Sequence, residues 1–204
     1  MKSIQQPLKE LLKATFSLKI EVPAWLVLSK TLLIPKNTQT RNAANYRPIA
    51  IQNAMYKLYT GILSEFIMDH CMSNNIITQH QAAGKRESWG CTDQLLINKM
   101  ILDEVTSNRR NLITVWLDYK KAFDSVPHSW IVESLKLAGV PEIIIENIKM
   151  LMNKWRTKLY LYGDTVNVET EEIDYCKGIL QGDTLSLIMF ILAVNPLSHQ
   201  LQKQ

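Results

Sequence analysis

The segment VWLDYKKAFDSV, from Val115 to Val126, decides how this sequence is expected to fold. It continues an apolar run, Leu112–Leu117, that is too short for a helix of its own, and such a run predicts a buried β-strand. The run ends at Asp118, so the strand would bring a carboxylate to the rim of a sheet, where metal binding or acid–base chemistry can occur. A capping or turn aspartate is the alternative interpretation of Asp118.

The sequence on either side alternates helical and strand patterns. Pro127 suits the first turn of a helix that Gly139 ends, another helix starts at Pro141, and Asp183 can cap a last helix through Asn195. Helical spacing also marks residues 7–20, 56–72 and 91–107, and strand patterns mark residues 25–28, 31–35, 156–162 and 166–175. These patterns predict a mixed domain of helices and strands.

Composition places the chain in the globular class. Its 204 residues are 47% hydrophobic and 21% charged, which is enough apolar material for a sizeable core. Residues 1–100 hold 12 basic and 6 acidic side chains, whereas residues 101–204 hold 11 and 13, so a basic half precedes a slightly acidic one. Such an asymmetry is compatible with a surface that binds a polyanion next to one that binds a metal.

Location is predicted from the cysteines and from the apolar stretches. Cys71, Cys91 and Cys176 are too few and too widely spaced for a disulfide framework, which favours a reducing compartment. The longest apolar stretch, residues 185–194, is shorter than the ~20 residues that cross a bilayer. A soluble intracellular protein without membrane contact is therefore expected, in either the nucleus or the cytoplasm.

Asp118, Phe123 and Asp124 together resemble motif A of reverse transcriptases, and specifically those of non-LTR, LINE-like retrotransposons. The resemblance implies that Asp118 is catalytic and binds Mg²⁺. It also implies that Phe123 blocks a ribose 2′-hydroxyl and so selects deoxynucleotides. Asp124 is expected to support the local structure.

A second match is GILQGDTLSL, from Gly178 to Leu187, which resembles motif B of the same family, usually written QGxxLSP. Gly182 permits close backbone approach, Asp183 caps the following helix, and Gln181 presents an amide in front of the turn. The resemblance implies that Gln181 and Gly182 contact the incoming nucleotide. Leu187 stands where the family often has proline, and a well-capped helix is the alternative interpretation.

Two basic residues in the first half are candidates for holding a triphosphate. Lys36 ends the sequence LIPK, and Arg47 lies in NYRPI; related polymerases use a lysine and an arginine of the fingers in this region. Cations are needed there because phosphoryl transfer develops charge on the leaving pyrophosphate. An exposed turn lysine is an equally good interpretation of Lys36, and Arg47 is the stronger candidate.

Three further basic residues are weaker candidates for contact with nucleic acid. Lys85 and Arg86 lie in QAAGKRESWGCTD, which resembles the QxGFRxGRST-D loop of the family, and Arg156 follows Trp155. Such residues could contact a nucleic-acid backbone. Basic residues in polar loops are more often simply solvated.

The resemblance implies an α+β right-hand polymerase fold, with fingers at residues 1–110 and a partial palm at residues 111–204 in which a small antiparallel sheet packs on helices. It implies a two-metal Mg²⁺ site, an RNA template, a DNA primer and deoxynucleoside triphosphates as partners. Two metals require more than one carboxylate. The YxDD sequence of motif C and the thumb are not found here, so this polypeptide is expected not to polymerise DNA by itself.

Two alternatives remain open from the sequence. One is a group II intron maturase-like reverse transcriptase, which shares these motifs. The other is a non-catalytic RNA-binding remnant, in which the basic residues still hold RNA although the chemistry is lost. Salt-sensitive RNA binding without metal-dependent primer extension would favour the remnant.

Overall fold

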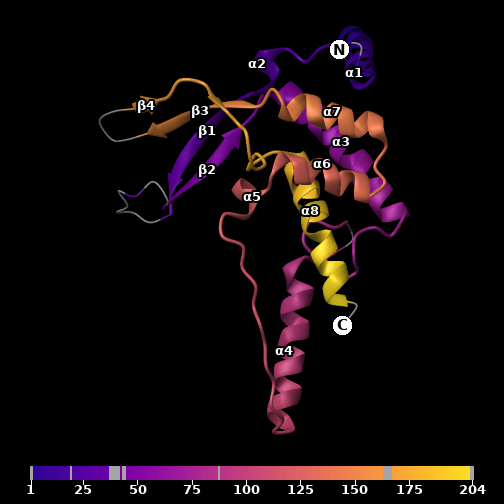
Figure 1. Ribbon diagram of the computed structural model, residues 1–204, viewed down its shortest axis with the longest axis vertical. Coiled ribbons are helices and arrows are strands. Elements are labelled where there is room, and N and C mark those ends of the chain that lie inside the picture. Colours follow the sequence, from indigo (N-terminus) through magenta and orange to yellow (C-terminus); the bar gives the residue numbers. More distant parts are fainter. Residues whose placement is uncertain are drawn as a thin grey trace.

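The computed structural model describes residues 2–18, 20–36, 42, 45–86, 88–162 and 167–202. The helices are α1 (Lys2–Phe16), α2 (Ala24–Val27), α3 (Ala54–Ser73), α4 (Cys91–Ser107), α5 (Ala122–Ser125), α6 (His128–Leu137), α7 (Glu142–Met152) and α8 (Thr184–Gln202). The strands are β1 (Leu28–Pro35), β2 (Tyr46–Ile51), β3 (Arg156–Tyr162), β4 (Asn167–Glu169) and β5 (Ile173–Asp174). Figure 1 shows a small sheet beside a helical body, from which α4 projects. The α+β class is confirmed.

The sheet has the order β2-β1-β3-β4, and β5 pairs with the start of β3. β1 is antiparallel to β2 but parallel to β3, so the prediction of a purely antiparallel sheet is wrong. The reason is connectivity: the chain passes through helices between β1 and β3 and returns in the same direction, as a crossover connection allows. The sheet thereby joins strands from both sides of the predicted boundary at residue 110.

β2 is a strand that the sequence patterns did not predict. Its Pro48 pairs in register with Leu33 of β1, and β2 lies at the edge of the sheet, where a missing backbone N–H is tolerated. Residues 28–35 form one strand, whereas two short strands were predicted at residues 25–28 and 31–35. Residues 24–27 form the short helix α2 instead.

The core is built by α3, α6, α7 and α8. Leu63, Ile67, Ile131 and Ile148 are completely buried there. α8 has the length and the apolar composition of a membrane-spanning helix, but it packs against α3 and α6, and this packing explains its composition. The four helices form the platform on which the loops of the site rest.

The predicted buried strand at Leu112–Leu117 is wrong. These residues have no regular secondary structure, and the exposed fractions of Ile113, Val115 and Trp116 are 90%, 75% and 72%. Figure 1 shows the segment as an extended chain, and among the described residues no strand pairs with it. An apolar run specifies a preference for burial, not the partner that provides it.

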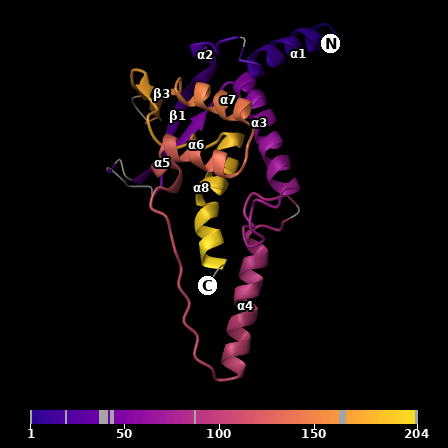
Figure 2. The ribbon, with the colours of Figure 1, turned by 45° about the vertical axis from the view of Figure 1, so that its right-hand side comes forward.

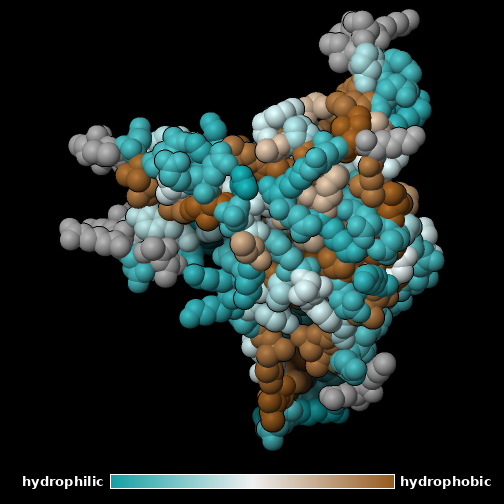
Figure 3. All heavy atoms as spheres, turned by 45° about the horizontal axis from the view of Figure 1, so that its top comes forward, coloured by the Kyte–Doolittle hydropathy of each residue, from teal (hydrophilic) through white to brown (hydrophobic). Residues whose placement is uncertain are grey.

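We call α4 together with residues 108–121 the arm. Figures 1 and 2 show it projecting from the helical body in both views, and in Figure 3 apolar side chains gather at the bottom of the view, where α4 lies. α4 has no buried residue, and Leu95, Met100 and Leu102 are among its exposed side chains. The predicted helix at residues 91–107 is confirmed, but its apolar side chains do not enter the core.

Candidate functional site

The loop from Gly178 to Asp183 is fixed against α5 by two backbone hydrogen bonds. The Gly178 N–H donates to Val126 O over 2.8 Å, and the Ile179 N–H donates to Phe123 O over 3.0 Å. Gly178 has φ +86°, and a Cβ atom there would lie 2.9 Å from the backbone of Asp124. Glycine is required at this point because the two backbones touch.

The same loop is fixed on its other side to β2. The Ala50 N–H donates to Gln181 O over 2.8 Å, and a Cβ atom on Gly182, which has φ +112°, would lie 2.7 Å from Ala50 O. The Gln181 side chain donates from Nε2 to Asp124 Oδ1 over 3.0 Å. The predicted close approach at Gly182 and the supporting role of Asp124 are both confirmed by these contacts.

A cavity of about 280 Å³ opens where the β1–β2 hairpin meets this loop. It is lined by Leu33, Lys36, Tyr46, Arg47, Pro48, Lys121, Asp124 and Gln181. The structure therefore brings together three of the predicted nucleotide-binding residues, Lys36, Arg47 and Gln181. The three cationic side chains around one cavity, with a single carboxylate, suit an anionic ligand.

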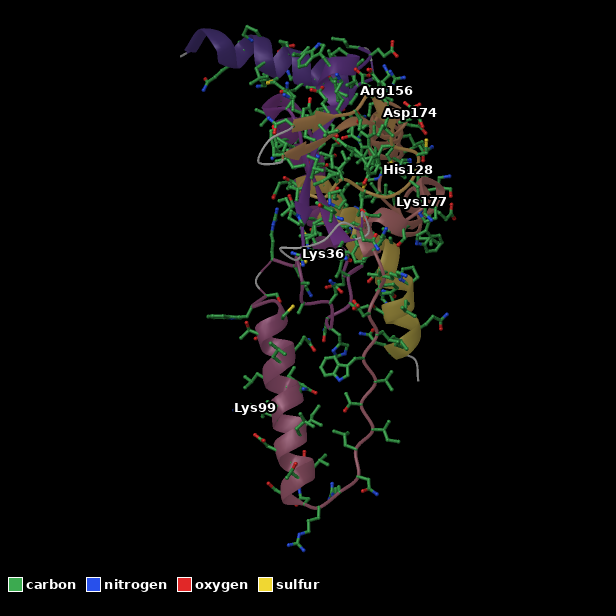
Figure 4. The ribbon with its side chains drawn as sticks, turned by 90° about the vertical axis from the view of Figure 1, so that its left-hand side faces the viewer. Lys36, Lys99, His128, Arg156, Asp174 and Lys177 are labelled. Atoms are coloured by element: carbon green, nitrogen blue, oxygen red, sulfur yellow. The ribbon has the colours of Figure 1, made fainter. Side chains whose placement is uncertain are left out.

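The hairpin register explains why Lys36 and Arg47 meet. Arg47 pairs with Ile34 across the strands, and the Lys36 N–H donates to Asn45 O over 2.8 Å just beyond them. Both side chains are exposed, and within the residues that the structure describes neither forms an ion pair. Lys36 is labelled in Figure 4. Cations that are not neutralised by the protein remain available to a ligand.

Lys121 is the third cation of the cavity, and no motif of the sequence predicted a role for it. It precedes α5 and has φ +53°, a left-handed backbone conformation that is unfavourable for a residue other than glycine. Lys121 and Asp124 lie close together in the sequence. Only the folded chain, which turns into α5 at this point, brings Lys121 to the cavity that Arg47 also lines. Tyr46 also lines the cavity without having been predicted.

A second cavity of about 290 Å³ shares Pro48, Asp124 and Gln181 with the first and continues under β1 and β3. Tyr175 lines it, and burial, assisted by the charge of Asp124, raises the pKa of its hydroxyl to about 12. Lys177 adds a cation to the rim of this cavity. The two cavities form one recess between the inner face of the sheet and the loop.

Behind the loop, Asp183 anchors the start of α8. Its side chain is 6% exposed and accepts a hydrogen bond from Thr60 Oγ1 over 2.7 Å. Asp183 directly precedes α8, at the position predicted for the cap, and its backbone carbonyl accepts from the Ser186 N–H over 3.2 Å. Burial raises the pKa of the Asp183 carboxyl above its usual range.

His128 holds the other end of the loop. Its Nε2 lies 2.9 Å from Gly178 O, so this nitrogen carries the donating proton, and the ring packs edge-on against Trp155. Burial lowers the pKa of His128 below its ordinary value of 6.5. Figure 4 shows His128 and Lys177 on the same side of the molecule.

Asp118 and Phe123 are not among the residues that line the two cavities. Asp118 lies on the exposed extended part of the arm, and the Phe123 ring packs edge-on against Phe190 of α8, with ring centroids 5.0 Å apart. Phe123 is half-buried against the core in this arrangement. Neither residue of motif A with a predicted role in chemistry lines a cavity that Gln181 lines.

The weaker basic candidates are largely paired within the chain. Arg86 bonds to Asp69 and Glu65 on α3, and the Arg156 Nε donates to Asp174 Oδ1 over 2.9 Å. Figure 4 shows Arg156 and Asp174 as neighbours. Contact with nucleic acid by either arginine would have to compete with these carboxylates. Lys85 forms no ion pair in the described part of the chain.

Carboxylates are too dispersed in the described residues to complete a metal centre. No group of three or more His, Cys, Asp or Glu side chains that could hold a metal occurs among them. Asp118 alone is insufficient, because a divalent cation of this kind takes several oxygen ligands. No catalytic step through a metal can be derived from these residues.

Comparison with known proteins gives a family and several relatives. The family model described as "Reverse transcriptase (RNA-dependent DNA polymerase)" matches residues 34–204. A "Retrovirus-related Pol polyprotein from type-1 retrotransposable element R2" of Popillia japonica is 30% identical over 189 residues, which are 91% of this chain and 25% of the relative.

Two further relatives are similar over most of this chain. The "Retrovirus-related Pol polyprotein from type-2 retrotransposable element R2DM" of Drosophila melanogaster is 26% identical, covering 90% of this chain and 16% of the relative. A type-1 R2 polyprotein of Nasonia vitripennis is 28% identical, covering 89% and 17%. The chain thus spans a quarter or less of the length of these relatives.

Proposed function

Because this chain belongs to the reverse transcriptase (RNA-dependent DNA polymerase) family, we propose that the cavity between Lys36, Arg47 and Gln181 holds an incoming deoxynucleoside triphosphate. The observation that carries the proposal is the convergence of Lys36, Arg47 and Lys121 on one cavity of about 280 Å³ beside the Gln181 amide. A triphosphate needs several cations, and Arg47 can hold two phosphate oxygens at once.

The proposed roles follow from the chemistry of each side chain. Arg47 and Lys36 reach in from the β1–β2 hairpin and would bind the phosphates. Gln181, held by Asp124, would face the sugar or base, and Gly182 keeps the loop close to Ala50. Phe123 would exclude a ribose 2′-hydroxyl, and its ring is held edge-on against Phe190.

We further propose a right-hand polymerase arrangement, with fingers in residues 1–110 and palm in residues 111–204. The R2 relatives and the recess between hairpin and loop support this division. Asp118 would be the carboxylate that this chain contributes to a divalent-metal site, with Mg²⁺ as the expected ion. Template-directed nucleotidyl transfer on an RNA template with a DNA primer is then the activity of the longer protein. Lys85, Arg86 and Arg156 remain candidates for template contact.

The test is the binding of dTTP in buffer with Mg²⁺, measured by titration calorimetry. Arg47→Ala should weaken binding about tenfold or more, since a charge-assisted hydrogen bond contributes roughly 1.5–3 kcal/mol. Arg47→Lys should fall between, because lysine keeps the charge but cannot bind two oxygens at once. Lys36→Ala and Lys121→Ala should show smaller losses.

Lys99→Ala is the matched control, because Lys99 is an exposed lysine on α4, away from the cavity (Figure 4). Equal affinities for Arg47→Ala, Lys36→Ala and Lys99→Ala would overturn the proposed triphosphate site. Circular dichroism of each variant checks that the fold is retained.

A further inference from the structure

Trp155 is a buried residue at the point where α7 leads into β3, and its side chain is only 2% exposed. Its backbone N–H donates to Met152 O of α7 over 3.3 Å. Its backbone carbonyl accepts from the Tyr175 N–H, which directly follows β5, over 3.0 Å. Trp155 is therefore held by the helical body and by the chain that leads to the Gly178–Asp183 loop.

The Trp155 indole contacts three side chains from three different parts of the chain. Its Nε1–H donates to the Tyr56 hydroxyl over 2.8 Å. The rings of His128 and Tyr175 pack edge-on against it, with ring centroids 5.5 Å and 6.2 Å away. We call Trp155, Tyr56, His128 and Tyr175 the Trp155 cluster. A buried indole N–H needs a hydrogen-bond partner, and Tyr56 provides it.

Two members of the Trp155 cluster hold the first part of the loop. His128 Nε2 lies 2.9 Å from Gly178 O, and the Tyr175 hydroxyl donates to Ile179 O over 3.3 Å. The N–H groups of Gly178 and Ile179 donate in turn to the carbonyls of Val126 and Phe123. The cluster thus fixes the carbonyls of a stretch whose N–H groups are fixed by the α5 segment.

Tyr56 connects the Trp155 cluster to the last residue of the loop. It is completely buried and lies one turn of α3 before Thr60, whose hydroxyl donates to Asp183 Oδ1 over 2.7 Å. Burial, assisted by the charge of Asp183, raises the pKa of the Tyr56 hydroxyl well above its usual range. Tyr56 is therefore a neutral hydroxyl when it accepts from Trp155.

Gln181 lies between the two parts of the loop that these contacts hold. Its backbone carbonyl accepts from the Ala50 N–H over 2.8 Å, and its Nε2 donates to Asp124 Oδ1 over 3.0 Å. It lines both cavities of the recess, whereas Trp155 lines neither. A group that binds a ligand must be held within about 0.5 Å of its productive position, which requires support from residues behind it.

We propose that Trp155 is a positioning residue for the recess: through the three side chains that contact it, it holds the Gly178–Asp183 loop where the Gln181 amide faces the cavity. Its effect on nucleotide binding rests on the proposed function of the site. Its effect on the position of the loop does not, and can be measured without a nucleotide.

The first test measures amide hydrogen exchange by NMR in the chain without ligand. Trp155→Phe keeps an aromatic ring and removes the N–H donor, and Tyr56→Phe removes the acceptor. Each variant should exchange the Ala50 amide, which donates to Gln181 O, about tenfold faster, since loss of a buried hydrogen bond has an effect of that order. Unchanged exchange at Ala50 in both variants would overturn the proposal.

Ile148→Val is the matched control for a general loss of stability. Ile148 is completely buried on α7, and valine removes one methylene group from the same core. The control should lower the melting temperature while keeping the Ala50 exchange rate within about twofold of the parent chain. Equal acceleration of exchange in Ile148→Val and Trp155→Phe would mean that Trp155 only stabilises the core, and the proposal fails.

The second test measures dTTP affinity by titration calorimetry in a double-mutant cycle. Gln181→Ala should weaken binding about fivefold, and Trp155→Phe should weaken it by up to the same factor. In the Gln181→Ala background, Trp155→Phe should cause no further loss, because its effect passes through Gln181. Additive losses would contradict the positioning role.

The two tests separate this proposal from the proposed triphosphate site. If the parent chain does not bind dTTP, the triphosphate site fails, and exchange at Ala50 still decides whether Trp155 positions the loop. If the parent binds dTTP and Trp155→Phe binds it equally well with an unchanged Ala50 amide, the triphosphate site stands and the role of Trp155 is refuted.

Discussion

At the scale of single residues, two glycines determine the geometry of the site. Gly178 brings its loop into backbone contact with α5, and Gly182 brings the same loop into contact with β2. Gln181 lies between them and bonds to Asp124, so the hairpin, α5 and the loop meet at one side chain. The loop sequence could suggest a turn, but only these contacts reveal why glycine occupies both positions.

Gly178→Ala should destabilise the fold by about 2–4 kcal/mol, because a positive φ and a backbone contact at 2.9 Å combine at this residue. Urea unfolding followed by circular dichroism measures the loss. Gly61→Ala is the matched control: Gly61 lies within α3 with no atom within 4 Å of an added Cβ, so alanine there should stabilise by about 0.5–1 kcal/mol. Equal stabilities of the two variants would contradict the contact at Gly178.

His128 should make the stability of the fold depend on pH. Its pKa is lowered in the folded chain, so below pH 6.5 the unfolded chain binds more protons than the folded one, and stability falls as the pH decreases through 6.5. Urea midpoints at pH 7.5 and pH 5.5 should differ less in His128→Gln, whose amide can still donate to Gly178 O. A His128 pKa above 6.5 by NMR titration would refute the prediction.

At the scale of elements, helices and strands followed their sequence patterns to different degrees. The helices at residues 91–107 and 128–137 were predicted because a helix forms its hydrogen bonds within one segment. The strand at Leu112–Leu117 was predicted and is absent, whereas β2, with its Pro48, is present and was not predicted. A strand depends on a partner elsewhere in the chain, which local periodicity does not identify.

Hydrogen exchange should distinguish the arm from the sheet. In the described structure, the amides of residues 111–118 donate no hydrogen bond and their side chains are exposed, so they should exchange within seconds at neutral pH. The amides of residues 29–33, in the central strand β1, should be protected at least about a hundredfold more. Comparable protection of the two segments would mean that the arm is paired in solution.

At the scale of the whole molecule, the site lies where the sheet meets the helical body. The β1–β2 hairpin and the loop from Gly178 to Asp183 form the recess proposed for the triphosphate. Asp118 does not line this recess and lies on the arm. Among the described residues, cations are thus assembled at the recess, whereas carboxylates do not form a metal-binding group.

The 204-residue chain should therefore bind nucleotides without extending a primer. With Mg²⁺, an RNA template, a DNA primer and deoxynucleotides, extension should not exceed the background, since no carboxylate cluster is present among the described residues. Gel analysis of a labelled primer measures this directly. Clear extension that Asp118→Ala abolishes would show that the arm brings Asp118 to the recess.

The sequence by itself determined the family, the order of the motifs and most helices, because motif residues and helical periodicity are local properties of the chain. It also identified Lys36, Arg47 and Gln181 as candidates for one site, although they lie far apart in the chain. Only the tertiary structure decided that these three residues meet in one cavity. It also decided that the first part of VWLDYKKAFDSV is exposed on the arm, whereas Phe123 and Asp124 contact α8 and the loop. The physical reason is that burial and strand pairing require partners from distant segments, and a local sequence pattern does not identify those segments.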